Sequence, residues 1–315
     1  MDEIICPDLQ FQDLFPIIQK HSGQLESLFN VDIALRGNKI MFDGQVRDKK
    51  SFRKYLGQVL KSIEQNGVFN EDDFKISLSL ANDGKIELLE KEIRSRSAIK
   101  LNGRDVYPKT YNQNSYIRAM LNNDLIFSIG PAGTGKTFLA IAVALHYLLA
   151  KSVERIVLTR PVVEAGEKLG FLPGDIQQKV NPYFRPLYDS LYYFIGFEKT
   201  SEHIEKGIIE IAPLAYMRGR SINNAFIILD EGQNTSNAQM KMFLTRFGQN
   251  SKVVVTADIS QIDLNEPKKS GIFKAIKILK RIKGIEITHL TAKDVVRNEL
   301  VQKIIEAYET KKDEI

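Results

Sequence analysis

The stretch "DLIFSIGPAGTGKTFLA", residues 124–140, decides the fold. In it a short apolar run leads into the glycine-rich loop "GPAGTGKT", Gly130 to Thr137, and an apolar helical pattern follows. Strand, G-x-x-x-x-G-K-[ST] loop and helix in this order are typical of a phosphate-binding loop, because backbone N–H groups of the loop and of the helix N-terminus face a bound anion. The sequence therefore predicts a nucleotide-binding α/β domain.

Each residue of this loop has an expected part in binding ATP and Mg²⁺. Lys136 is expected to neutralise the β- and γ-phosphates and to act in catalysis, while Thr137 offers its hydroxyl to Mg²⁺. The other loop residues are expected to surround the phosphates with backbone N–H groups. They are Gly130, Pro131, Ala132, Gly133, Thr134 and Gly135.

Two further strand ends carry acidic or amide side chains that fit the same chemistry. In "AFIILDEGQNT", residues 225–235, Asp230 is expected to hold Mg²⁺ and Glu231 to orient or deprotonate the attacking water. Gln233 either senses the γ-phosphate or begins the next helix. In "KVVVTADISQID", residues 252–263, Gln261 is expected to contact the γ-phosphate, with a plain polar loop as the alternative.

Apolar runs alternate with helical segments over the last two thirds of the chain. Because such runs are bounded by turns and separated by helices, they predict a parallel sheet with helices on both faces, a RecA-like P-loop domain. The runs are 124–130, 155–160, 207–213, 225–230, 252–258 and 284–290.

The chain is expected to divide into three parts. Residues 1–82 suggest a small α+β domain, with amphipathic helices on either side of a hairpin at "RGN" (36–38). Residues 83–106 are polar and are expected to form a linker, and 107–315 to form the ATPase domain.

Composition bounds the class of protein. The 315 residues carry a net charge of +5, which is compatible with nucleic acid without requiring it. The single cysteine, Cys6, suits a reducing compartment, and the acidic start does not resemble a signal peptide. The longest apolar run, 138–150, is too short to span a bilayer. We expect a cytoplasmic protein with no membrane partner.

These motifs together resemble the phosphate-starvation-inducible PhoH-like ATPase family. The resemblance rests on "PKTYNQ", "GPAGTGKT", "LTRPVVEAGEKLGFLPGDIQQKVNPYFRPLYDSL", "PLAYMRGRSINNAFIILDEGQNTSNAQMKMFLTRFG", "VVVTADISQIDL" and "DVVRNELVQKIIEAYE", and it covers nearly all of 107–309. It implies an ATPase with one RecA-like core, akin to superfamily 1 helicases and tied to RNA metabolism. It also implies ring-shaped homo-oligomers, such as hexamers, and association with a ribosomal-RNA-processing endoribonuclease. Gln113 in "PKTYNQ" matches the position that reads adenine.

The sequence departs from the family pattern at a few positions. Gly232 stands where the resemblance implies alanine, Ala257 where it implies glycine, and Asn298 where it implies histidine. None of these changes removes a phosphate or metal ligand. The N-terminal part is similar to the KH-like domain of the long family members, yet it lacks the G-x-x-G loop with which KH domains hold nucleic acid. RNA binding and protein docking therefore stay equally open for it.

The segment "GEKLGFLPGDIQQKVNPYFRPLYDSL", residues 166–191, mixes glycines, prolines, aromatic residues and cations. Three interpretations stay open: contact with single-stranded RNA, a subunit interface, or packing within the domain. The first would use Lys168, Lys179, Tyr183 and Arg185. "TRP" just upstream resembles a helicase motif that touches the strand, which makes Thr159 and Arg160 further candidates.

Two basic features follow near the end of the chain. "KKSGIFKAIKILKRIK", residues 268–283, is expected to be an amphipathic helix with a solvated basic face. Capping-box spacing in "TAKD" (291–294) suggests a helix start, with Arg297 in its first turn. Arg297 either stabilises the transition state, in its own or a neighbouring subunit, or is a surface residue.

The function expected from the sequence is Mg²⁺-dependent ATP hydrolysis coupled to RNA in an oligomer. The alternative is an ATP-dependent adaptor that docks an endoribonuclease or a ribosome-associated partner without unwinding. A GTPase is disfavoured because the N-K-x-D guanine-reading motif is missing, and a small-molecule kinase because no acceptor site or lid is recognisable.

Overall fold

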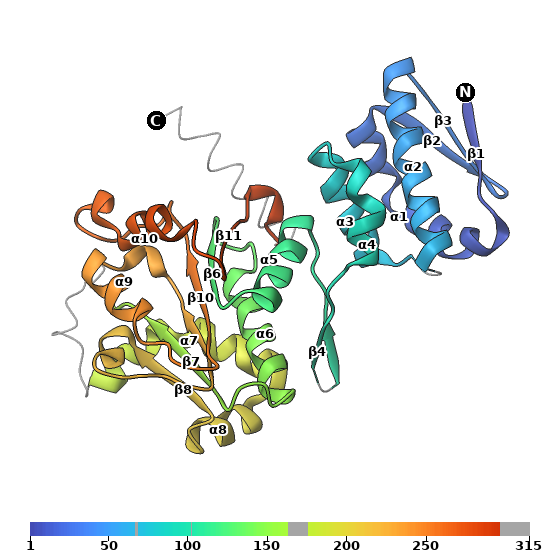
Figure 1. Ribbon diagram of the computed structural model, residues 1–315. Helices are drawn as coiled ribbons and strands as arrows, with labels where there is room; N and C mark the ends of the chain where they lie inside the picture. The colour runs from blue at the N-terminus through green and yellow to red at the C-terminus, as the bar shows by residue number, and fades with distance from the viewer. Residues whose placement is uncertain (67–68, 102, 163–175, 297–315) are drawn as a thin grey trace. The chain divides into compact units, whose positions relative to one another are not determined.

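The computed structural model describes residues 1–66, 69–101, 103–162 and 176–296. The chain folds into two compact units (Figure 1). Met1–Ala98 and Tyr107–Asn114 form the N-terminal unit, and Ile99–Val106 and the chain from Ser115 onward form the C-terminal unit.

The N-terminal unit is a three-stranded antiparallel sheet covered by helices. Strands β1 (Asp2–Ile5), β3 (Lys39–Gly44) and β2 (Val31–Arg36) lie in that order, and Gly37 turns the β2–β3 hairpin with φ +57°. The positive φ explains why glycine follows Arg36 in the expected "RGN" turn. The helices are α1 (Asp8–Phe29), α2 (Val46–Asn66), α3 (Glu71–Asn82) and α4 (Leu89–Arg94).

Several basic side chains along α2 are paired with acids of the same unit. Arg53 lies 2.9 Å from Asp2, Lys49 lies 3.2 Å from it, and Lys61 lies 2.7 Å from Glu90. Residues 1–98 hold 14 of the 44 Lys and Arg and 16 of the 39 Asp and Glu, which is a net charge of −2. The remaining residues therefore carry +7, and the positive charge of the chain is concentrated outside the first 98 residues.

Residues 83–106 contain ordered elements. Helix α4 closes the core of the N-terminal unit with Leu89 and Ile93. The hairpin β4 (Ile99–Leu101) and β5 (Arg104–Val106) packs on the C-terminal unit, where Lys100 O contacts His146 Nδ1 at 3.0 Å.

The C-terminal unit contains a six-stranded sheet in which every pairing is parallel. Its order is β11-β6-β10-β9-β7-β8, so β10 lies between the phosphate-loop strand β6 and the acid-bearing strand β9. All six expected strands are confirmed, and so is the parallel P-loop domain. Their bounds are β6 Leu125–Ile129, β7 Arg155–Arg160, β8 Ile209–Pro213, β9 Ala225–Leu229, β10 Lys252–Ala257 and β11 Ile285–His289.

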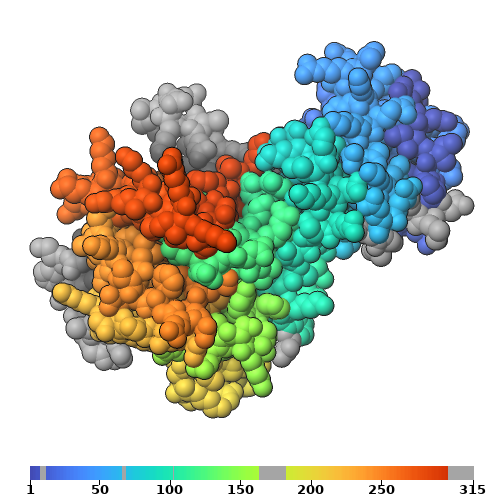
Figure 2. Space-filling view, in the orientation of Figure 1, coloured from blue at the N-terminus to red at the C-terminus, as the bar shows by residue number. Residues whose placement is uncertain are grey.

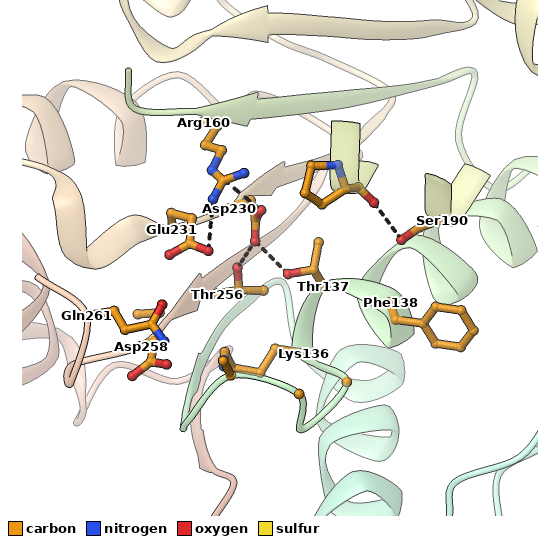
Figure 3. Close-up of a pocket in the computed structure, with 15 residues that line it drawn as sticks. Lys136, Thr137, Phe138, Arg160, Ser190, Asp230, Glu231, Thr256, Asp258 and Gln261 are labelled. Carbon is orange, nitrogen blue, oxygen red and sulfur yellow. Dashed lines mark hydrogen bonds and ion pairs between the residues drawn. The ribbon is translucent and has the colours of Figure 1, made fainter. Parts of the chain in front are cut away.

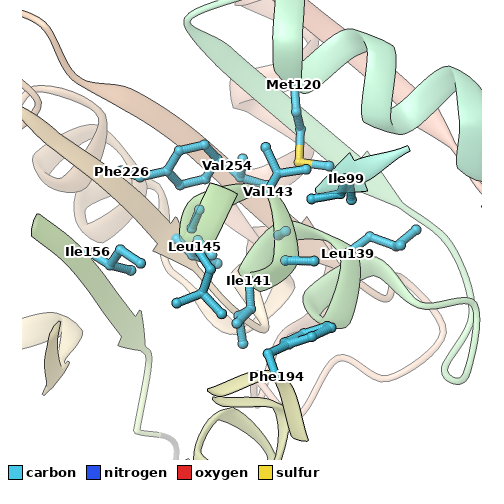
Figure 4. Packing of buried hydrophobic residues seen from close by; sticks show 14 of the residues in the cluster. Ile99, Met120, Leu139, Ile141, Val143, Leu145, Ile156, Phe194, Phe226 and Val254 are labelled. Carbon is cyan, nitrogen blue, oxygen red and sulfur yellow. The ribbon is translucent and has the colours of Figure 1, made fainter. Parts of the chain in front are cut away.

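The central strands β6, β7, β9 and β10 are buried on both faces, and their alternate residues supply two cores. On β9, Phe226 and Ile228 join one cluster, whereas Ile227 and Leu229 join the other. Figure 4 shows the first cluster, in which Phe226 and Val254 of the sheet meet Leu145 and Val143 of α6. Burial on both faces accounts for strands that are apolar throughout rather than alternating.

Helices cover the two faces separately (Figure 1). The first face carries α5 (Tyr111–Asn122), α6 (Lys136–Leu149) and α7 (Ile176–Ile195), with α8 (Phe197–Glu205) against β8. The second face carries α9 (Asn237–Leu244) and α10 (Gly271–Leu279).

Helix α10 matches the expected amphipathic helix. Ile272 and Ala275 are buried, whereas Lys274 and Lys277 are exposed. The space-filling view shows α10, in orange-red, at the surface of its unit (Figure 2). None of the described helices is both long and apolar enough to cross a membrane.

Candidate nucleotide-binding site

The loop between β6 and α6 has the backbone of a phosphate cradle. Gly133 and Gly135 have φ values of +79° and +84°, which residues other than glycine rarely adopt. Gly130 is required for a different reason, because a Cβ there would lie 2.5 Å from Leu290 O at the end of β11. Gly133 and Gly135 therefore allow the turn into α6, and Gly130 allows the close approach of Leu290.

Lys136, the first residue of α6, folds back over the loop. Its Nζ donates to Gly130 O at 2.6 Å and to Pro131 O at 2.8 Å. Burial lowers the pKa of Lys136, although Asp258, Glu231 and Asp230 oppose that shift. A cation held this way, partly desolvated beside a glycine-rich loop, is suited to bind an anion.

Asp230 joins the loop to the neighbouring strands (Figure 3). Its Oδ1 accepts hydrogen bonds from the Thr137 hydroxyl at 2.5 Å and the Thr256 hydroxyl at 2.6 Å. Asp230 is 4% exposed and directly follows β9. Its carboxylate and the Thr137 hydroxyl are hard oxygen ligands of the kind that Mg²⁺ prefers, so the residues present fit this ion.

Glu231, the next residue after Asp230, has an unusual backbone conformation. It has φ +55° and ψ 39°, in the left-handed region that few residues other than glycine adopt. Its Oε1 lies 3.0 Å from Arg160 Nη2. Burial, and then the charge of Asp230, raise the pKa of Glu231, while Gln233 and Arg160 oppose the shift.

Gln233 is fully buried and binds three protein groups. Its Nε2 donates to Glu231 Oε2 at 2.5 Å and to Gln261 O at 3.0 Å, and its Oε1 accepts from the Asp258 N–H at 2.9 Å. The side chain therefore joins the end of β9 to the loop after β10. Gln233 is the middle residue of the 3₁₀ helix Gly232–Asn234.

A cavity of about 270 Å³ brings the predicted groups together. Asp258 and the exposed Gln261 line it from the β10 side. Asp258 Oδ1 accepts from Ser260 at 2.6 Å, whereas the buried Oδ2 has no partner among the described residues. The sequence did not single out Phe138 or the α7 residues Pro186 and Ser190, which also line the cavity. Phe138 directly follows the phosphate loop, and Pro186 and Ser190 lie in the segment 166–191, for which the sequence left three interpretations open.

The other loop residues lie where the motif places them. Ala132, Gly133 and Gly135 line the cavity, and the Thr134 hydroxyl donates to Pro131 O at 2.8 Å. Gln113, the expected adenine reader, belongs to the N-terminal unit, where its Oε1 accepts from the Lys109 N–H.

The expected nucleic-acid residues take different positions. Thr159 is fully buried on β7, so its side chain offers no surface to a nucleic-acid strand. Arg160 lines the cavity and faces the two carboxylates rather than the solvent. Tyr183 is partly buried and Arg185 is exposed on α7. Three residues lie outside the part of the chain whose side chains the structure describes: Lys168, Lys179 and Arg297.

Where a helix start was expected at 291–294, the described residues form a single 3₁₀ turn. Thr291 and Asp294 form a capping box around the 3₁₀ helix Ala292–Asp294, and Val295 then leaves helical geometry. The Val296 N–H donates to Gly133 O at 3.0 Å, so this end of the described chain contacts the phosphate loop.

Comparison with known proteins identifies the family. The model of the family described as PhoH-like protein matches residues 105–309. The chain belongs to the PhoH-like protein family. A PhoH-like protein of Bacillus subtilis (strain 168) is 48% identical over 288 residues, 90% of this chain and 89% of that protein. A PhoH-like protein of Synechocystis is 47% identical over 280 residues, covering 88% and 84%.

Among solved structures, the Sulfolobus solfataricus SWI2/SNF2 ATPase core in complex with dsDNA aligns with 57% of this PhoH-like chain and 44% of that chain. Its TM-score is 0.35 and its sequence identity 15%. Family membership therefore rests on the sequence match. The phosphate loop, the parallel sheet and the carboxylates at its edge give this PhoH-like protein an ATPase-type fold.

Proposed function

We propose that this protein hydrolyses ATP with Mg²⁺ at the cavity between β6, β9 and β10. One observation carries the proposal: Thr137 of the phosphate loop and Asp230 at the end of β9 share a hydrogen bond of 2.5 Å. Hydroxyl and carboxylate meet there within the same cavity as Lys136 and Glu231. This combination suits phosphoryl transfer to water, in which positioning and electrostatics do most of the work.

Each residue has a part in that reaction. Lys136 would leave its two loop carbonyls and bind the terminal phosphates, and Thr137 and Asp230 would hold Mg²⁺. Bound Mg²⁺ neutralises charge that builds up on the phosphate oxygens. Glu231 would accept a proton from the attacking water, which needs its carboxylate form. Asp258 and Gln261 would sense the terminal phosphate from the β10 side.

Steady-state phosphate release tests this proposal. Wild-type protein with ATP and Mg²⁺ is expected to turn over, and Lys136→Ala to fall to background. EDTA should remove the activity and excess Mg²⁺ restore it. Equal rates for wild type and Lys136→Ala would overturn the proposal.

We further propose that hydrolysis is coupled to single-stranded RNA in an oligomer. The net charge of +7 outside residues 1–98, and the exposed basic face of α10, support an RNA partner. The single RecA-like core leaves room for a neighbouring subunit to complete the site, and Arg297 could then act in trans. Stimulation by single-stranded RNA that declines with added salt would support this coupling. A monomer with full, RNA-independent activity would contradict it.

The adaptor alternative draws on the N-terminal unit. Residues 1–98 carry a net charge of −2, and several cations of α2 are engaged in ion pairs, as in the pair of Arg53 with Asp2. Such a surface fits protein docking, for example of an endoribonuclease, better than phosphate binding. Deleting residues 1–98 discriminates the two: retained RNA stimulation would assign RNA to the ATPase unit and leave the N-terminal unit for docking.

A further inference from the structure

We infer that Arg160 is a positioning residue that links helix α7 to Glu231, so that the position of α7 sets the orientation of the proposed base. The inference rests on the proposed function and gives Arg160 a different part from contact with a nucleic-acid strand. It follows from the partners of one guanidinium group at the end of β7.

Arg160 directs its nitrogens to two separate elements. Nη2 lies 3.0 Å from Glu231 Oε1 and Nε lies 4.0 Å from Asp230 Oδ2, both at the end of β9. Nη1 donates to the backbone carbonyl of Tyr183, in α7, at 2.6 Å. Figure 3 shows the side chain reaching over the two carboxylates. The contacts with β9 and α7 therefore pass through a single rigid, planar group.

The geometry of these contacts requires arginine. A guanidinium offers donors in several fixed directions, whereas a lysine ammonium is a compact point charge on a flexible stem. Arg160 is 20% exposed and Glu231 29% exposed, so solvent screens their attraction only in part. Hydrogen bonds between ionised groups under such conditions are stronger than neutral ones. The link is thus able to hold Glu231 in one orientation.

Helix α7 has weaker backbone hydrogen bonding around Tyr183 than in its second half. Pro182 and Pro186 each remove an amide donor from the helix, which weakens its hydrogen bonding around Tyr183. Its second half is anchored by Leu187 and Leu191, which are fully buried in the core against α6. A shift of the weaker half would move the carbonyl that Arg160 holds.

The same helix also forms one wall of the nucleotide cavity. Pro186 and Ser190 line it, and the Ser190 hydroxyl donates to Pro186 O at 2.9 Å. A molecule in the cavity would contact α7 at Pro186 and Ser190, which lie within two helical turns of Tyr183, the residue that Arg160 contacts. Occupancy of the cavity and orientation of Glu231 become coupled through this helix.

Two substitutions separate the charge of Arg160 from its geometry. Arg160→Gln removes both, and Arg160→Lys keeps the charge without the several fixed donor directions of the guanidinium. Arg155→Gln, at the opposite end of β7, is the matched control. Two readouts are needed: the pH profile of kcat, and amide hydrogen exchange over residues 183–191 of α7, with and without Mg²⁺ and a non-hydrolysable ATP analogue.

In the wild type, the analogue is expected to slow exchange in α7 at least several-fold. Arg160→Gln should lose that response, lower kcat about tenfold or more with little change in KM, and move the acid limb of kcat to higher pH. Arg160→Lys should keep the acid limb near that of wild type and still lose the α7 response. Arg155→Gln should behave as wild type in both.

Other outcomes would overturn the link. If the analogue binds and α7 exchange stays unchanged in the wild type, or if Arg160→Gln keeps both the response and the pH profile, Arg160 does not couple α7 to Glu231. Failure of the proposed function is distinguishable, because wild-type protein would then bind the analogue and release no phosphate above the Lys136→Ala background. The exchange measurement still decides the link in that case.

Discussion

The hydroxyl of Thr137 lies 2.5 Å from Oδ1 of Asp230, although the two residues are 93 positions apart in the chain. They meet because β6 and β9 flank β10 in a parallel sheet, so both strands end at one edge. Ligands of open parallel sheets bind at that edge. The topology, rather than either motif alone, assembles the proposed Mg²⁺ site.

Thr256 supports this site from β10 and is the subject of a first prediction. Its hydroxyl donates to Asp230 Oδ1 at 2.6 Å from a fully buried position. Thr256→Val keeps the shape and removes the donor, so Asp230 loses orientation. Partners of this kind typically change metal affinity about 10- to 100-fold. We expect the Mg²⁺ concentration for half-maximal hydrolysis to rise by that factor, and Thr256→Ser to recover most of it.

Gln233 is predicted to affect turnover rather than nucleotide binding. Its side chain contacts Glu231, Gln261 and the Asp258 N–H. Gln233→Met removes the acceptor of the buried Asp258 N–H and leaves this backbone group unpaired. An unpaired buried group costs about 1–3 kcal/mol, which denaturant unfolding would measure. We expect kcat to fall while the KM for ATP changes little. A large rise in KM with normal kcat would instead place Gln233 on the phosphates.

Gly232 is predicted to be fixed by space rather than by backbone freedom. It does not adopt a positive φ, yet a Cβ would lie 2.7 Å from Val255 Cγ1 and 3.1 Å from Thr256 O. Gly232→Ala should therefore destabilise the C-terminal unit by about 1–3 kcal/mol through overpacking. Val255→Ala should offset much of this loss in the double mutant, because the two residues contact each other.

Gly57 offers the matched control for that substitution. It lies exposed within α2, and nothing lies within 4 Å of an added Cβ. Gly57→Ala should stabilise the N-terminal unit by roughly 0.5–1 kcal/mol, because alanine loses less conformational freedom in a helix. Hydrogen exchange, read separately in the two units, checks both results. Equal stability of Gly232→Ala and wild type would show that β9 and β10 move apart at little cost.

The sequence was sufficient for the fold of the C-terminal unit, for a physical reason. Strands buried on both faces read as short apolar runs, and all six were located within two residues of their bounds. The phosphate loop was recognisable because Gly133 and Gly135 need φ values that glycine allows. In the N-terminal unit, β1 and α3 were missed, since a four-residue strand and a helix rich in acids and serines lack strong periodicity.

The contacts of individual side chains could not be predicted from the sequence. The motif around Arg160 suggested contact with a nucleic-acid strand. In the structure, the Arg160 guanidinium faces Asp230 and Glu231 instead. Gln233 was expected either at the γ-phosphate or in a helix, and its three protein partners come from chain segments that only the sheet order brings together. Residue type and spacing indicate which groups are available, and tertiary packing decides what each one contacts.

The last prediction concerns pH. Burial and the charge of Asp230 raise the pKa of Glu231, so a larger fraction is protonated at a given pH than for an exposed glutamate. If Glu231 acts as the base, kcat must fall on an acid limb that lies above the usual glutamate range. Glu231→Gln should remove that limb and lower kcat about 10²- to 10⁴-fold, with nucleotide binding retained.

The same shift has a consequence for stability with the opposite sign to that of a salt-bridged carboxylate. Because the folded pKa of Glu231 is raised, the folded state favours the protonated form, and this contribution to stability is lost as pH rises through that pKa. Glu231→Gln should therefore make the C-terminal unit more resistant to denaturant at pH 8, with a smaller effect at pH 4. A variant less stable than wild type at pH 8 would mean that the contact with Arg160 outweighs the cost of burying the charge.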